Sequence, residues 1–153
     1  TGKIAVAYPS DYGYAADLSL CQKELESYIV NPDVLYKFVS KKVLLPDFKN
    51  LLNDSLNCFY YDVMDQYSNA FHEIDRTKNI QTTNNEARKY INCCWQTLEG
   101  KLTLINGKQL LSFVIKYMKK TYNVNLTKNK ILDNFGFDDV DKEIKDVIDS
   151  IIK

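Results

Sequence analysis

Apolar residues recur at helical spacing over most of the chain, from about residue 15 to the end. In residues 51–74 the apolar side chains form one stripe, while Asp62, Asp65 and Asn69 fall on the opposite side. A period near 3.6 residues is typical of amphipathic helices. The pattern predicts a mainly α-helical fold with six or seven helices.

One segment, at about residues 108–122, has apolar residues around most of its circumference. These residues are Leu110, Leu111, Phe113, Val114, Ile115, Tyr117 and Met118. A helix that is apolar on nearly all sides is buried among other elements. The sequence therefore predicts a globular bundle around this central helix, with only a narrow polar strip exposed, as a single domain over residues 1–153.

Short signals predict where individual helices begin and end. Asn31 is followed by a proline, and this pair is typical of a capped helix start. Thr83 with Glu86 three residues later fits a capping box, so a helix is expected to begin there. Gly100 is placed to end that helix with a positive φ, and Thr127 predicts a further helix start.

The beginning of the chain differs from the rest, because Ile4–Tyr8 has the composition of a buried strand, followed by a polar turn with a glycine and then a helix. Free backbone amides at such a helix start can bind a phosphate. Residues 3–19 resemble the first strand, phosphate loop and helix of flavodoxin-like domains, most closely those of flavodiiron proteins. The resemblance implies that Ser10, Tyr12 and Gly13 lie in a loop that binds the phosphate of FMN.

Beyond residue 29 the chain lacks the further buried strands that a flavodoxin fold requires. The residues themselves therefore favour an extended arm or strand over residues 1–14, packed on a helical domain without a cofactor. An FMN-binding, flavodoxin-like fragment is kept as an alternative.

Catalytic residue types are scarce. The sequence contains a single histidine, His72, which leaves few ways to build a Ser-His-Asp or Cys-His site. The helix face with Asp62, Asp65, Asn69 and His72 offers metal-ligand types, but polar residues opposite an apolar stripe are typical of a solvent-exposed face. We therefore expect a non-enzymatic protein with no catalytic residues and no metal site.

Several features bear on compartment and origin. No apolar run reaches the roughly 18 residues that a membrane span needs, and no signal peptide is recognisable at the start. The expectation is a soluble, cytoplasmic chain whose four cysteines are reduced and buried. The Lys-, Asn- and Ile-rich usage is that of an AT-rich genome, in the general style of small helical regulatory proteins of viruses and pathogens that act on a host.

The predicted function is binding to another protein, because aromatic residues make up 12% of the chain and suit contact surfaces. Trp95 lies off the main apolar face of its helix, in the position of a typical interface anchor, and the alternative is that it closes the edge of the core. Tyr90 and Phe71 are the other residues predicted to contact a partner.

Charge supplies the second alternative. Twenty basic and twenty acidic residues cancel over the whole chain, yet residues 101–130 contain seven lysines and no acid. The two helices predicted there, joined by a short turn, have the layout of a helix-turn-helix, so nucleic-acid binding is an alternative function. Its predicted contacts are Lys108, Lys116, Lys119, Lys120, Lys128 and Lys130.

Overall fold

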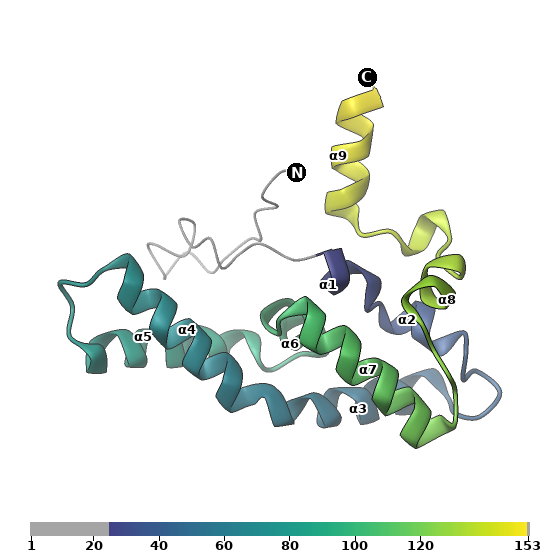
Figure 1. Cartoon of the computed structure of the whole chain (residues 1–153), viewed down its shortest axis with the longest axis horizontal. Coiled ribbons are helices and arrows are strands. Elements are labelled where there is room, and N and C mark those ends of the chain that lie inside the picture. Colours follow the sequence, from purple (N-terminus) through teal and green to yellow (C-terminus); the bar gives the residue numbers. More distant parts are fainter. Residues whose placement is uncertain (1–24, 153) are drawn as a thin grey trace. The chain divides into compact units, whose positions relative to one another are not determined.

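The computed structural model describes residues 25–152, which form helices and turns without a strand (Figure 1). This architecture confirms the mainly α-helical fold class. The described residues divide into two compact units, called unit 1 (residues 50–105) and unit 2 (residues 25–49 and 106–152). The expected arm at residues 1–14, with the phosphate-loop residues Ser10, Tyr12 and Gly13, lies outside the described residues.

Unit 1 is built on a helical hairpin of α4 (Tyr60–Ile74) and α5 (Ile80–Cys94). The chain enters the unit through α3 (Leu45–Ser55) and a 3-10 turn, η3 (Leu56–Phe59), which leads directly into α4. The short helix α6 (Leu98–Leu104) follows α5 and packs against it. The single helix expected over residues 51–74 is thus interrupted by the 3-10 turn.

Three aromatic rings form the centre of unit 1. Tyr67 stacks on Tyr90 with ring centroids 5.6 Å apart, and Phe71 meets Tyr90 edge-on at 6.0 Å. All three are buried, with 5% of Tyr67, 2% of Tyr90 and 1% of Phe71 exposed. These residues hold α4 against α5, because each helix contributes rings to the same cluster.

The start of α5 differs from the prediction. Asn79 is the N-cap, and its side-chain oxygen accepts a hydrogen bond of 2.8 Å from the amide of Thr82. Thr83 is buried inside the helix, where its hydroxyl donates to the carbonyl of Ile80, and Glu86 pairs with a lysine. The predicted capping box is therefore wrong, because Asn79 caps the helix four residues earlier and Asn is at least as good a cap as Thr.

Gly100 also has a different role from the one predicted. It lies in the first turn of α6, where its amide donates to the hydroxyl of the N-cap Thr97 at 3.0 Å. No described glycine has a positive φ. A side chain at Gly100 would overlap the carbonyl oxygen of Cys94 at the end of α5, so close approach of the backbone, and not φ, requires glycine here.

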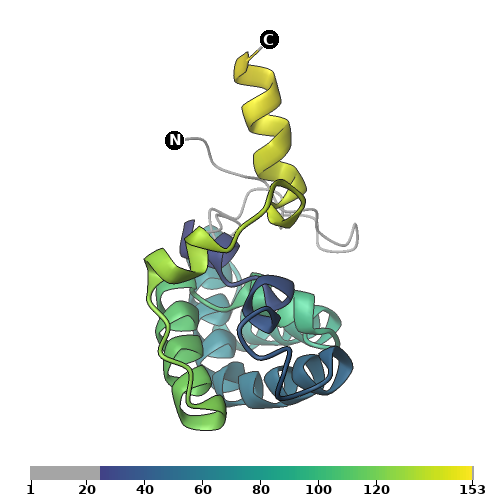
Figure 2. The same ribbon diagram turned by 90° about the vertical axis from the view of Figure 1, so that its right-hand side faces the viewer.

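Unit 2 contains several short helices and one long one. They are α1 (Leu25–Ile29), α2 (Pro32–Tyr36), α7 (Gly107–Tyr122), α8 (Lys128–Asp133), the 3-10 turn η4 (Phe137–Asp139) and α9 (Lys142–Ile152). The caps predicted at Asn31 and Thr127 are confirmed: Asn31 accepts from the amides of Asp33 and Val34, and Thr127 from that of Lys130. Helix α1 packs against α7 and α8 (Figure 2).

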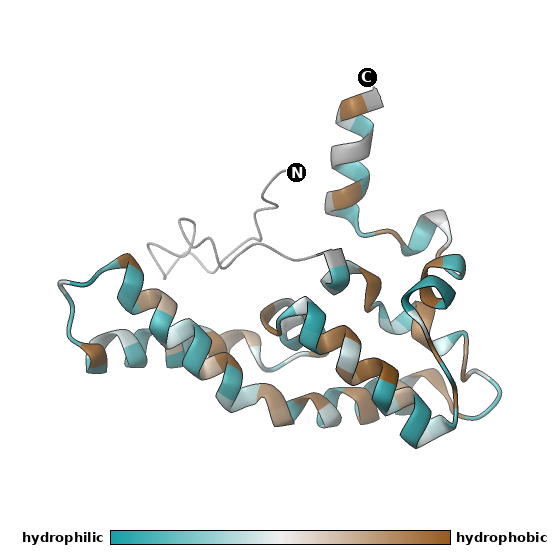
Figure 3. Cartoon of the chain, in the orientation of Figure 1, coloured by the Kyte–Doolittle hydropathy of each residue, from teal (hydrophilic) through white to brown (hydrophobic). Residues whose placement is uncertain are grey.

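Helix α7 supplies much of the core of unit 2. Its buried residues are Gly107, Leu110, Leu111, Val114 and Met118. Seven of its sixteen residues are exposed, so its polar side is broader than the narrow strip expected. Hydrophilic and hydrophobic residues accordingly alternate along α7 (Figure 3), as in a helix with one buried side.

Candidate functional site

Trp95 lies directly after α5, is partly exposed and is held in place on several sides. Its indole N–H donates to the side-chain oxygen of Asn57 at 3.1 Å. Tyr60 packs edge-on against the indole with ring centroids 5.5 Å apart, and the ammonium of Lys101 lies 5.6 Å from the ring centroid. A hydrogen bond, a ring contact and a cation–π contact therefore fix the orientation of the indole.

Lys101 is one of two buried polar or charged residues among the described part of the chain, with 5% of its surface exposed. Its ammonium donates to the side-chain oxygen of Asn57 at 2.8 Å and to the carbonyl of Asn53 at 3.2 Å. Asn53 belongs to the last turn of α3, and Asn57 belongs to the 3-10 turn η3 that follows. Burial lowers the pKa of Lys101, and the negative charge of Asp54 partly offsets this shift. Through its contacts with Asn53, Asn57 and the indole of Trp95, this lysine has a structural role.

Two tyrosines extend the aromatic surface around Trp95. The hydroxyl of Tyr60 donates to the side-chain oxygen of Asn92 at 2.6 Å, which ties the start of α4 to the end of α5. Tyr61 packs edge-on against Tyr60 at 5.5 Å, and 78% of its surface is exposed. We call Tyr60, Tyr61 and Trp95 the aromatic surface.

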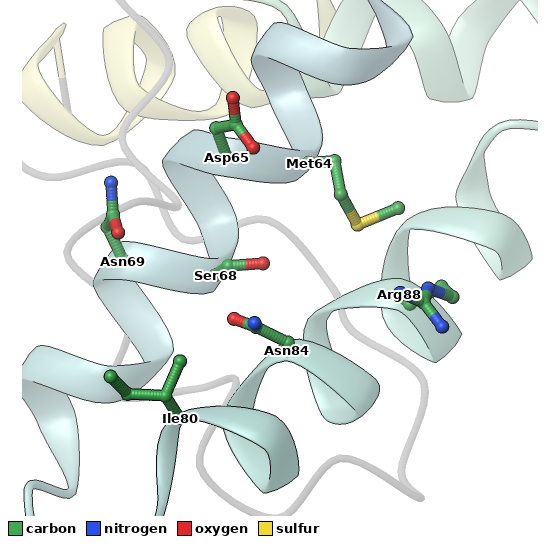
Figure 4. Close-up of a pocket in the computed structure, with 7 residues that line it drawn as sticks. All are labelled: Met64, Asp65, Ser68, Asn69, Ile80, Asn84 and Arg88. Carbon is green, nitrogen blue, oxygen red and sulfur yellow. The ribbon is translucent and has the colours of Figure 1, made fainter.

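A pocket of about 400 Å³ lies between α4 and α5 (Figure 4). It is lined by Met64, Asp65, Ser68, Asn69, Ile80, Asn84 and Arg88. The α5 members follow one another at four-residue spacing, and the next position in that series is Asn92, the partner of Tyr60. Because residues four apart share a helix face, the pocket adjoins the aromatic surface along the same side of the hairpin.

The three residues predicted to contact a partner protein have different positions. Tyr90 and Phe71 lie in the core of unit 1, with 2% and 1% exposed, so neither is accessible to a partner. Only Trp95 remains at the surface. The exposed Tyr61 was not predicted, although consecutive residues on a helix point about 100° apart, so that one of Tyr60 and Tyr61 could be expected nearer the solvent side.

The predicted nucleic-acid contacts also separate into groups. Lys108, Lys116, Lys119 and Lys120 are exposed on α7. In contrast, Lys128 forms an ion pair with Glu26 at 3.7 Å, and the Lys130 ammonium donates to a backbone carbonyl in the preceding turn at 3.2 Å. Lys119 also donates to a side chain, the Oδ1 atom of Asn123 at 3.0 Å. The structure therefore places four of the six lysines on the exposed side of one element.

The cysteines were expected to be reduced and buried. The three cysteines within residues 25–152 are free, but Cys58 and Cys93 are exposed and Cys94 is only partly buried. The expectation of burial is therefore wrong for Cys58 and Cys93. Loss of hydration raises the pKa of the Cys58 and Cys94 thiols, which favours the protonated, unreactive form.

Metal-binding groups and membrane-spanning helices were also sought in the described residues. Within residues 25–152, no group of three or more His, Cys, Asp or Glu side chains is placed to hold a metal ion. In the same part of the chain, no helix combines the length and the apolar character that crossing a membrane requires.

No protein-family model matches the sequence, and neither a curated protein nor a solved structure is significantly similar to the chain. The functional conclusion therefore depends on the geometry of the described residues.

Proposed function

We propose that this chain is a non-enzymatic protein–protein interaction module and that the aromatic surface of unit 1 contacts the partner. The observation that carries the proposal is the partly exposed Trp95, whose orientation is fixed by Asn57, Tyr60 and Lys101. Trp and Tyr are strongly enriched among the few residues that supply most of the binding energy of an interface.

Fixing the indole in advance favours binding. A mobile side chain that becomes ordered in a complex costs about 0.5–1.5 kcal/mol, and a side chain that is already ordered avoids most of this cost. The polar ends of Trp95 and Tyr60 already have partners within unit 1. A partner that covers the rings therefore leaves neither the indole N–H nor the phenol O–H without a hydrogen bond.

The adjoining pocket supplies the other component of a typical interface, a polar margin around an apolar centre. Ser68, Asn69 and Asn84 offer hydrogen-bond donors and acceptors, and Figure 4 shows Ser68 and Asn84 pointing into the space between the helices. Arg88 at the same pocket is one of only two arginines in a chain with 20 basic residues. Its planar guanidinium suits bidentate contact with a carboxylate of a partner.

The test compares partner binding by matched variants. Tyr61→Ala removes a ring that is 78% exposed, and Leu44→Ala removes a side chain in unit 2 that is 70% exposed. The chain is immobilised, proteins retained from an extract of the native source are quantified, and the affinity of the purified partner is measured. We expect Tyr61→Ala to weaken binding about tenfold or more and Leu44→Ala to leave it unchanged.

Trp95 also provides a direct signal, since it is the only tryptophan of the chain. The bound partner should shield Trp95 from quenching by iodide, whereas a partner bound elsewhere should not. Equal retention of the same partner by wild type, Tyr61→Ala and Trp95→Phe, with unchanged quenching, would contradict the proposal.

A further inference from the structure

The exposed side of α7 carries four lysines and no acid. Lys108, Ser112, Lys116 and Lys120 follow one another at four-residue spacing, Lys119 lies beside them, and all five are exposed. The twelve residue steps from Lys108 to Lys120 span about 18 Å at 1.5 Å per residue. The opposite side of the helix is the buried apolar side, so the lysines point away from the core of unit 2.

A lysine from a distant part of the sequence extends this basic side. The ammonium of Lys42 donates to the carbonyl of Tyr122, the last residue of α7, across 80 positions of sequence. Lys42 is exposed and lies at the end of the helix that carries Lys119 and Lys120. We call Lys42, Lys108, Lys116, Lys119 and Lys120 the lysine face.

The four α7 lysines have no acid close by in sequence, because residues 100–132 contain no Asp or Glu. Helix stability explains only part of the arrangement. Cations near the end of a helix interact favourably with its dipole, which suits Lys42, Lys119 and Lys120. Lys108, however, lies in the first turn of α7, where a positive charge is unfavourable, and the first turn has no acid.

We infer that the lysine face binds the phosphate backbone of a nucleic acid. Opposite charge attracts the polyanion, and each lysine can replace a counterion on a phosphate. Gln109 and Ser112 are exposed among the lysines and can hydrogen-bond to phosphates or to base edges. This activity is separate from the proposed contact with a protein, because it uses other residues in the other unit.

The geometry favours nucleic acid over an anionic membrane as the partner. A helix that binds a membrane surface inserts its apolar side below the headgroups. The apolar side of α7 is already buried in unit 2, with Leu110, Val114 and Met118 at 0% exposure. Only the charged side is available, and a phosphodiester backbone with hydrogen-bonding bases makes better use of it than a lipid surface does.

The experiment measures binding of the full chain to a fluorescein-labelled 20-base-pair DNA duplex and to a 20-nucleotide single-stranded RNA by fluorescence anisotropy. Contacts to about five phosphates predict a loss of affinity of about 10²- to 10³-fold between 50 and 200 mM NaCl for the duplex. The double variant Lys116→Gln/Lys120→Gln should weaken binding and reduce the salt slope by about two. Lys89→Gln, which removes an exposed lysine from α5, is the matched control and should change neither.

The two probes distinguish the source of the phosphodiester backbone, and binding to either one supports the inference. Binding that is unaffected by the double variant overturns it, as does the absence of binding to both probes at 50 mM NaCl. Vesicles with 30% phosphatidylserine form a third arm, and binding to vesicles without binding to the duplex or the RNA also overturns it. Circular dichroism of each variant checks that the helices are retained.

Discussion

Units 1 and 2 have similar cores and different surfaces. In unit 1 the buried Phe71 contacts two tyrosine rings, and in unit 2 the buried Phe48 likewise contacts Tyr36 and Tyr122. Residues 50–105 of unit 1 carry seven acids and five basic residues, of which Lys101 is buried. The described residues of unit 2 carry ten acids and twelve lysines, and four of these lysines lie on α7, which has no acid.

The comparison shows that similar helical packing supports two separate surfaces. The aromatic surface depends on polar contacts that orient each ring, such as the one from Trp95 to Asn57. The lysine face needs no such positioning, because charge acts over about 8–10 Å at ordinary salt concentration. A binding function in unit 1 is therefore sensitive to small structural changes, while one in unit 2 depends mainly on charge.

The largest expected effect comes from a matched pair of core variants, Phe71→Ala in unit 1 and Phe48→Ala in unit 2. Both phenylalanines are fully buried, with 1% and 0% exposed. Each substitution should lower the free energy of unfolding by about 3–5 kcal/mol, because it leaves a cavity. Urea unfolding is followed both by fluorescence of Trp95, which reports on unit 1, and by far-ultraviolet circular dichroism, which reports on all helices.

We expect Phe71→Ala to lower the fluorescence midpoint more than Phe48→Ala does, and Phe48→Ala to affect mainly the dichroism signal. If both variants shift both signals equally, the two units unfold as one body and the comparison between them fails as a description of stability.

The period of the apolar residues predicted the helices well, because an amphipathic pattern can be recognised within each segment alone. The helix class, the cap at Asn31 and the cap at Thr127 could all be inferred from a few neighbouring residues. The start of α5 could not, since Asn79 and Thr83 are both acceptable caps and tertiary packing buries the latter. Gly100 was misinterpreted for a related reason: its role depends on a contact with Cys94 that local sequence does not encode.

The residues of the candidate sites likewise fall into those that local sequence places and those that depend on tertiary packing. The lysines of α7 were predicted, because their spacing within one helix is visible in the sequence. Which aromatic residues are exposed was not predicted correctly, because Tyr90 and Trp95 differ in burial only through the way α5 packs on α4 and the 3-10 turn. Lys42 was missed altogether, since only the fold brings it to the end of α7.

A smaller effect is expected from Gly100→Ala. The added methyl group would overlap the carbonyl of Cys94, so the contact between α5 and α6 must open. Overpacking of this kind costs about 1–3 kcal/mol, and we expect the loss in the fluorescence-detected unfolding of unit 1. Gly136→Ala in unit 2 is the milder comparison, because the methyl group there would lie 3.3 Å from a side-chain oxygen of Asp139 and would not overlap a backbone carbonyl. Equal stability of Gly100→Ala and wild type would show that the approach of α6 to α5 is not rigid.

The smallest expected effect is a difference between the units in how their stability depends on pH. Burial, with Tyr117 beside it, raises the pKa of Tyr122 in unit 2 above the ordinary value of about 10. Above pH 10 the unfolded chain loses this proton while the folded chain keeps it, so stability falls as pH rises, by less than about 1 kcal/mol at pH 10.5. Lys101 in unit 1 acts in the opposite direction, because its lowered pKa means that the unfolded chain holds more protons as pH rises toward about 10.5.

Urea unfolding at pH 8 and at pH 10.5 isolates the contribution of Tyr122. Tyr122→Phe should lose less stability between the two pH values than wild type, since the group that resists ionisation is gone. Tyr61→Phe, at a tyrosine that is 78% exposed in unit 1, should behave as wild type. Because Lys101 is present in all three proteins, its opposing effect cancels in the comparison. An identical pH dependence of Tyr122→Phe and wild type would contradict the prediction, because it would mean that the Tyr122 hydroxyl reaches water in the folded protein.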